Sequence, residues 1–308
     1  MKTYKGFNKN MTCRGFQYEE GKEYKTEKAV ACETGFHACE YPLDCFNYYS
    51  PNDSVFHEVE QDGDISKHND DTKVASTKIK IGAEINIAGL VKAAIEYTLK
   101  RVNPEAKSNE DYGASSATGY KGASSATGDY GASSATGDYG ASSATGDYGA
   151  SSATGYKGAS SATGDYGASS ATGDYGASSA TGYKGASSAT GYKGASSATG
   201  YKGASSATGD YGASSATGNC GASSATGYKG AAEAGDPESI AVAWGYKGKA
   251  KGVIGSYLVL ADWEGNENEY WTQEEWNLKG AKMIRVDGVN IKENTYYTML
   301  NGKIVEAK

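Results

Sequence analysis

Hydrophobic and polar positions follow different rhythms in successive parts of this 308-residue chain. In the first hundred residues, Thr3–Phe7, Ser54–Glu60 and Lys73–Ile81 have the β-rich or alternating character of short strands. Pro42 starts a short predicted helix that extends toward Tyr49, because proline suits the first helical turn. Together these elements predict a small α+β domain over residues 1–104.

The clearest predicted helix covers residues 87–102. Its apolar side chains recur at helical spacing, and Asn103-Pro104 ends it. This stripe consists of Val91, Ala94, Ile95, Thr98, Leu99 and Val102. Because the helix directly precedes a repeat array, we expect it to cap the otherwise open core of the first coil.

From Gly113 to Lys229, a unit of nine residues occurs thirteen times without insertion. Each unit is the heptapeptide Gly-Ala-Ser-Ser-Ala-Thr-Gly followed by a two-residue link, which is Tyr-Lys, Asp-Tyr or, once, Asn-Cys. So strict a period is the signature of a repeat architecture. A disordered linker is the alternative, because small polar residues bury too little surface to offset their ordering entropy. The strict register and the tyrosine in nearly every unit favour an ordered array.

Within each unit, the residues from the first alanine to the last glycine predict one short strand, and glycine suits the tight corners. Alternation along the strand places Ser115 and Ala117 on one side and Ala114, Ser116 and Thr118 on the other. One unit supplies one strand, so a closed coil needs two units, or about 18 residues. The predicted fold class is mainly β: a thin, flat parallel β-solenoid between a small α+β N-terminal domain and a small β-rich C-terminal unit.

Every second link alternates strictly between a basic and an acidic corner, which supports the 18-residue coil because opposite charges would then stack. The corner tyrosines offer rigid contact area at low entropic cost, so we predict a binding surface there. This corner ladder, with one tyrosine of the opposite edge, consists of Tyr120, Lys121, Tyr130, Asp138, Tyr139, Tyr156, Lys157, Asp174, Tyr175, Tyr192, Lys193, Asp210 and Tyr211.

After the array, the same rhythm continues with bulkier residues over 238–260, so the predicted solenoid spans residues 105–262. The remaining residues, 263–308, predict a β-rich C-terminal unit. Its strands are expected near Ala281–Val286, Thr295–Leu300 and Lys303–Val305, with a hairpin turn at Asn301-Gly302.

Two segments resemble known families. Ser239-Ile240-Ala241-Val242-Ala243-Trp244-Gly245 and Lys249-Ala250-Lys251-Gly252 are similar to the head repeats of trimeric autotransporter adhesins. That resemblance covers about residues 113–260 and implies a parallel β-roll and a homotrimer. The Gly-Gly-x-Gly-x-Asp unit of calcium-binding rolls is missing, which argues against calcium.

The N-terminal motifs carry the second resemblance. Tyr4-Lys5-Gly6-Phe7, Cys13-Arg14-Gly15-Phe16, Gly35-Phe36-His37-Ala38-Cys39 and Pro42-Leu43-Asp44-Cys45 resemble an uncharacterised domain common in bacteriophage and Firmicutes proteins. This family has no assigned activity, and the resemblance implies a phage or prophage origin.

Charge and composition exclude several classes of partner. The net charge is −7, and the array is neutral because its six lysines balance six aspartates. We therefore expect no nucleic-acid binding, which requires a basic stripe. The longest apolar stretch is too short to cross a bilayer, and no secretory signal follows Met1. We expect the cytoplasm of a host bacterium, or a virion after lysis, as the location.

Candidates for chemistry lie in residues 1–104. Cys32, His37, Cys39 and Cys45 could hold zinc, but their spacing lacks the Cys-x-x-Cys pair of structural sites, so we predict no metal or cofactor. His37 with Glu40 or Asp44, or His57 alone, could act as a general base. No catalytic motif accompanies them.

These observations predict a non-enzymatic structural or interaction protein of phage or prophage type. Its β-roll would space or display domains and bind a protein partner or further copies of itself. Three alternatives remain: an intracellular inhibitor of a host defence factor, an enzyme in residues 1–104 with the array as a spacer, and an ice-binding solenoid.

Overall fold

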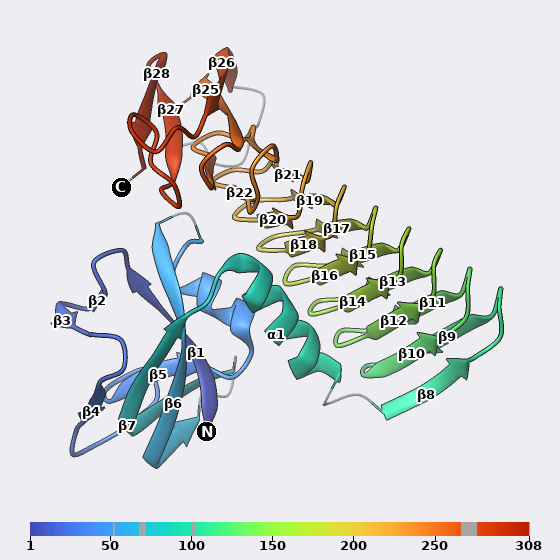
Figure 1. Ribbon diagram of the computed structural model, residues 1–308. Coiled ribbons are helices and arrows are strands. Elements are labelled where there is room, and N and C mark those ends of the chain that lie inside the picture. The colour runs from blue at the N-terminus through green and yellow to red at the C-terminus, as the bar shows by residue number, and fades with distance from the viewer. Residues whose placement is uncertain (52, 68–71, 100–102, 266–275, 308) are drawn as a thin grey trace.

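The computed structural model describes residues 1–51, 53–67, 72–99, 103–265 and 276–307, and it is mainly β (Figure 1). The N-terminal part is an antiparallel sheet of five strands in the order β4-β7-β5-β1-β6, and β6 also pairs with β7 so that the sheet curls back on itself. Its strands are β1 (Lys2–Asn8), β4 (Glu23–Lys25), β5 (Phe36–Cys39), β6 (Ser54–Lys67) and β7 (Lys73–Glu84). A hairpin of β2 (Thr12–Cys13) and β3 (Phe16–Gln17) and the 3-10 helix η1 (Pro42–Asn47) complete it.

A parallel β-solenoid of about nine turns, each of about 18 residues, occupies residues 107–260, which confirms the predicted fold class. Its strands alternate between two sheets. The first sheet, called the covered sheet below, contains β8 (Asn103–Ser108), β10 (Gly122–Ala126), β12 (Ala141–Thr145), β14 (Ala159–Thr163), β16 (Ala177–Thr181), β18 (Ala195–Thr199), β20 (Ala213–Thr217), β22 (Ala231–Ala234) and β24 (Lys249–Gly252). The second, called the bare sheet, contains β9 (Ala114–Thr118), β11 (Ala132–Thr136), β13 (Ala150–Thr154), β15 (Ala168–Thr172), β17 (Ala186–Thr190), β19 (Ala204–Thr208), β21 (Ala222–Ala225), β23 (Ile240–Ala243) and β25 (Tyr257–Glu264).

The core of the roll is made of serine and alanine. Ser115 and Ala117 of β9 are buried while the other side chains of that strand are exposed, as alternation predicts. The buried serines of the two sheets then form a hydrogen-bonded ladder. The Ser160 hydroxyl donates to the Ser151 carbonyl at 3.0 Å and accepts from the Ser169 hydroxyl at 2.9 Å. Buried hydroxyls are therefore satisfied by identical partners nine residues away, which is why so polar a core is tolerated.

The corners depend on the last glycine of each heptapeptide. Gly155 has a φ of +149°, and a Cβ there would lie 1.9 Å from the carbonyl oxygen of Gly137 in the preceding coil. Gly158, which opens the next heptapeptide, would place a Cβ at ordinary contact, 3.4 Å from Ala153. Only the first of these two glycines is therefore required by the backbone itself.

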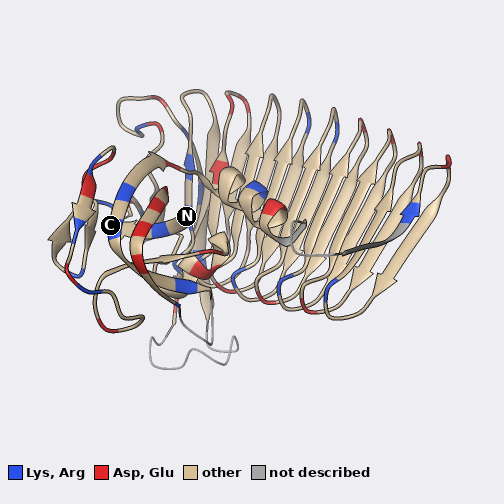
Figure 2. Ribbon diagram, turned by 90° about the horizontal axis from the view of Figure 1, so that it is seen from below, with Lys and Arg blue, Asp and Glu red and all other residues tan. Residues whose placement is uncertain are grey.

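The described helix α1 (Ile87–Leu99) packs on later coils and does not cap the first one, so that prediction is wrong. It lies instead across the outer face of the covered sheet, against β12, β14, β16, β18 and β20 (Figures 1 and 2). Leu90 and Val91 are fully buried there with the alanine column that includes Ala159 and Ala177. The physical reason is that a column of methyl groups offers the apolar stripe of the helix a larger flat surface than the end of a thin coil would. Residue 102 of the expected stripe lies outside the described residues.

The C-terminal strands extend both sheets of the solenoid. β26 (Asn277–Arg285) pairs antiparallel with β25, and β27 (Tyr297–Leu300) pairs antiparallel with β24 and with β28 (Lys303–Glu306). They close the end of the roll, since antiparallel addition stops the parallel progression. No helix among the described residues is long and apolar enough to cross a membrane.

Candidate functional site: binding surfaces

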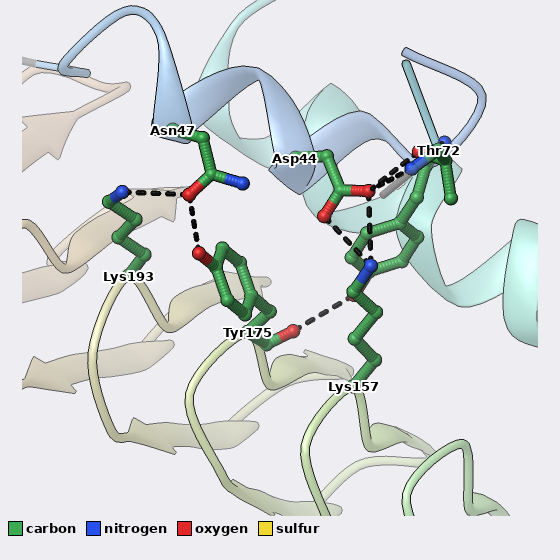
Figure 3. Close-up of polar contacts among 7 residues, drawn as sticks. Asp44, Asn47, Thr72, Lys157, Tyr175 and Lys193 are labelled. Atoms are coloured by element: carbon green, nitrogen blue, oxygen red, sulfur yellow. Dashed lines mark hydrogen bonds and ion pairs between the residues drawn. The ribbon is translucent and has the colours of Figure 1, made fainter. Parts of the chain in front are cut away.

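One edge of the solenoid is occupied by the N-terminal domain (Figure 3). The Lys157 ammonium lies 2.9 and 3.0 Å from the two carboxylate oxygens of Asp44, and both side chains are at most 4 % exposed. Asp44 also accepts hydrogen bonds from the backbone N–H and the hydroxyl of Thr72. Asp44 belongs to η1, so the pair joins the domain to the fifth link of the array.

The neighbouring links strengthen this contact. The buried Tyr41 hydroxyl donates to the Tyr175 carbonyl at 2.9 Å, and burial, followed by the charge of Asp44, raises the pKa of Tyr41 well above its usual range. Asn47 accepts hydrogen bonds from the Tyr175 hydroxyl and, at 2.9 Å, from the Lys193 ammonium. Burial lowers the pKa of Lys193. Three successive coils therefore bind η1 through side chains of their links.

This contact changes the interpretation of the predicted corner ladder, because three of its members face the N-terminal domain and are not on the surface. Lys157, Tyr175 and Lys193 are buried, whereas Tyr139, Asp210 and Tyr211 are half-buried. Tyr120, Lys121, Tyr130, Asp138, Tyr156, Asp174 and Tyr192 remain exposed. The sequence predicts that Lys157 stacks against the acidic links of neighbouring coils, but its ammonium pairs with Asp44 of the N-terminal domain.

The opposite edge carries an exposed tyrosine stack, of which the prediction included only Tyr130. The rings of Tyr112, Tyr130, Tyr148 and Tyr166 lie parallel, with centroids 4.8, 4.5 and 4.8 Å apart and interplanar angles of 4–5°. Partial burial, followed by the charges of the neighbouring tyrosines, raises the pKa of Tyr130. The signal in the sequence is four successive Asp-Tyr pairs at 18-residue spacing, beginning at Asp111-Tyr112. Because the ring faces pack on each other, this edge presents phenol edges and hydroxyls to a partner.

The bare sheet presents a flat face beside that stack. In β15, for example, Ala168 and Thr172 are exposed and Ser170 is half-buried, and the neighbouring repeat strands pair with it in register. The corresponding serines of β9, β11 and β13 are exposed. A shallow trough lined by these alanines and serines runs from β9 to β23. None of the outward side chains in these described repeat strands is charged, and Figure 2 shows the charges of the array confined to its turns.

A cavity of about 760 Å³ opens in the N-terminal domain, between β1, the β2–β3 hairpin, β5 and the end of η1. Lys5 of β1 is only 5 % exposed, and its ammonium donates to the His37 carbonyl at 2.8 Å. The rings of Phe16, Tyr18 and Tyr24 line the same cavity and contact one another edge to face at 4.8 to 5.5 Å.

The candidate zinc residues do not converge in the structure. The ring of His37 is fully engaged, since Nε2 accepts from the Cys32 N–H at 3.0 Å and Nδ1 lies 3.1 Å from the Gly35 carbonyl. Cys45 donates to the Tyr4 carbonyl, and no group of three metal-ligating side chains occurs among the described residues. Burial, followed by the charge of Lys5, lowers the pKa of His37.

The carboxylates expected near His37 serve other partners. Asp44 pairs with Lys157, and Glu40 pairs with Lys67 at 2.6 Å. His57 is 2 % exposed, and its Nδ1 contacts the Gly82 carbonyl at 2.8 Å. Within the described part of the chain, its Nε2 has no hydrogen-bond partner. The nearest carboxylate oxygen to His57, Oε2 of Glu20, lies 3.9 Å from Nδ1, which is beyond hydrogen-bond distance.

Comparison with known proteins reaches only the N-terminal part. Residues 1–93 match the model of a family described as a domain of unknown function (DUF7666). No curated protein and no solved structure matches the chain.

Proposed function

We propose that the chain is a non-enzymatic structural and interaction protein of phage or prophage type whose solenoid associates with a second copy through the outer face of the bare sheet. The observation that carries the proposal is the asymmetry of the roll. Its two sheets are built from the same heptapeptide, yet α1 covers one and leaves the other flat, uncharged and in register.

The size of this face suits a pair of copies. Seven repeat strands of about five residues occupy it. At about 4.8 Å between strands and about 3.3 Å per residue, they span roughly 34 by 17 Å. Two copies would then bury roughly 1,100 Å² in total, which is just above the ~1,000 Å² expected of a specific interface.

The same asymmetry favours a dimer over the trimer that the adhesin resemblance implies. A ring of three needs two different patches on each copy, whereas one self-complementary face closes a dimer. The N-terminal domain already occupies the covered sheet, so one large sheet face remains. Methyl and hydroxyl groups of alanine, serine and threonine can interdigitate closely because none is bulky.

A charge placed in the centre of the face tests the proposal. Ser170→Lys introduces an ammonium in the outward serine column of β15. Thr163→Lys, at an exposed position of the covered sheet, is the matched control. Sedimentation should give a dimer for the unsubstituted chain and the control, and a monomer for S170K. If S170K sediments as a dimer as well, the face is not the interface.

A second candidate, ice binding, is favoured by one feature of the same face: its threonines are exposed and paired in register, as for Thr136, Thr154 and Thr172. Such a regular row is also what any sheet ladder produces. Thermal hysteresis above that of buffer, abolished by S170K but kept by T163K, would establish ice binding in place of self-association.

A further inference from the structure

We propose that the cavity in the N-terminal domain binds a nucleotide, with its phosphate on Lys5 and Arg14 and its base against the rings of Phe16 and Tyr24. This inference is independent of the solenoid, since it concerns a separate site in residues 1–93.

The first observation is a buried cation without an acid. Lys5 is 95 % buried, and its ammonium contacts the His37 carbonyl at 2.8 Å and the Cys13 sulfur at 3.5 Å. It also lies 5.3 and 5.7 Å from the ring centroids of Phe7 and Tyr18, which attract a cation but carry no negative charge. No carboxylate of the described residues lies within ion-pair distance of it. A buried ammonium without a counter-ion destabilises a fold, so its presence at a cavity indicates an anion that binds there.

The second observation is the charge of the lining. Four cationic side chains and a single carboxylate border the cavity: Lys5, Arg14, Lys25, Lys73 and Glu33. Arg14 sits at the tip of the β2–β3 hairpin with a φ of +49°, followed by Gly15 at +80°, a turn that brings it to the rim. The charges of Lys5, Lys73 and Arg14 each add to the burial that lowers the pKa of His37, so their fields meet inside the site. A phosphate is the anion that several converging cations bind best.

The third observation is aromatic surface left open to solvent. Phe16 is 48 % exposed although it borders the cavity, and Tyr24 beside it is half-buried. Exposed aromatic rings next to a cationic pocket suit a nucleotide base, because every base has a flat π-face that can stack on such a ring. The volume of about 760 Å³ lies within the range of small-molecule sites.

Calorimetric titration of the full chain with AMP, ADP, GDP, UDP and inorganic phosphate tests the inference. We expect at least one nucleotide to bind with a Kd below about 1 mM and more tightly than phosphate. Lys5→Met should weaken binding at least about tenfold, Lys5→Arg should retain it, and Lys2→Met, an exposed lysine of the same strand, should leave it unchanged. Phe16→Ala should weaken nucleotide binding but not phosphate binding.

The thermal midpoint of the ligand-free variants separates binding from a structural role of Lys5. If the lysine is there for an anion, K5M should unfold at the same temperature as the unsubstituted chain or higher. A midpoint lowered by several degrees would show that Lys5 supports the fold and would overturn the proposal. Failure of all the nucleotides to bind at millimolar concentration would overturn it as well, as would phosphate binding as tightly as the best nucleotide.

Discussion

Removing one partner of the ion pair between Lys157 and Asp44 should destabilise the protein more than the loss of any other link contact. Both groups are almost fully buried, and the lysine reaches both carboxylate oxygens at 2.9 and 3.0 Å. Lys157→Met leaves the carboxylate buried with only the two hydrogen bonds from Thr72. Removing one partner of a buried pair typically costs about 3–5 kcal/mol, so we expect a loss of that size in the free energy of unfolding.

Replacing both partners should restore much of the loss. In K157M/D44N, no charge is left buried, and an asparagine oxygen can still accept from Thr72. We expect the double variant to lie within about 1–2 kcal/mol of the unsubstituted chain, because a buried pair and its neutral replacement often have similar stability. The coupling energy of the double-mutant cycle should therefore exceed about 2 kcal/mol.

The repeat supplies a matched control. Lys121 occupies the same position of an identical unit two coils earlier, where the side chain is exposed. K121M should change the free energy of unfolding by less than about 0.5 kcal/mol. Urea denaturation followed by circular dichroism measures K157M, D44N, K157M/D44N and K121M. Equal effects of K157M and K121M, or a coupling energy near zero, would refute the docking of η1 on the array.

Three further predictions concern the corners of the roll, its serine ladder and its contact with the N-terminal domain. Gly155→Ala should lower the free energy of unfolding by about 3 kcal/mol or more, because the alanine must adopt a positive φ and its Cβ clashes with a backbone oxygen. Gly158→Ala should lower it by less than about 1 kcal/mol. Equal effects of the two substitutions in urea denaturation would contradict the corner geometry. Ser160→Ala breaks two rungs of the serine ladder and should cost about 1–3 kcal/mol, measured in the same way; a stabilising effect would show that the ladder is dispensable. The free energy of unfolding should fall as pH rises above about 10, since the phenols of Tyr41 and Tyr296 then lose protons in the unfolded chain that they keep when buried. Tyr41→Phe should flatten this slope in denaturation curves taken between pH 8 and 11.5, and an unchanged slope would exclude Tyr41 as its source.

The β-roll could be predicted from the sequence because each repeat unit contains the residues that determine its own strand and turn. A period of nine gives the strand, alternation of the links gives the coil of two strands, and the burial of Ser115 with Ala117 follows from the period of two along a strand. Each inference used local chemistry that does not depend on the rest of the molecule.

Because the repeat units are identical, the sequence does not show which of the two sheets is covered by the N-terminal domain. Ala159 of the covered sheet and Ala168 of the bare sheet occupy equal positions of equal heptapeptides, yet one is buried under the N-terminal domain and the other is exposed. Which face is covered depends on the links, where Lys157 and Lys193 come into register with Asp44 and Asn47. That register is a long-range match between η1 and the array, which no local pattern encodes.

The cavity was missed for a related reason. The chemistry of Cys32, His37, Cys39 and Cys45 groups them as candidate ligands, whereas Lys5 gives no signal in the sequence because a single lysine in a strand is usually exposed. Only its burial next to His37 and Cys13, without an acid, marks it.

The mass of the unsubstituted chain in solution tests the central claim most directly. A chain of 32.0 kDa that pairs through the bare sheet should give twice that mass by light scattering across a dilution series, until dissociation begins at low concentration. A mass of 32.0 kDa at every concentration would contradict self-association through this face, and a mass of three times the chain would contradict a single self-complementary interface.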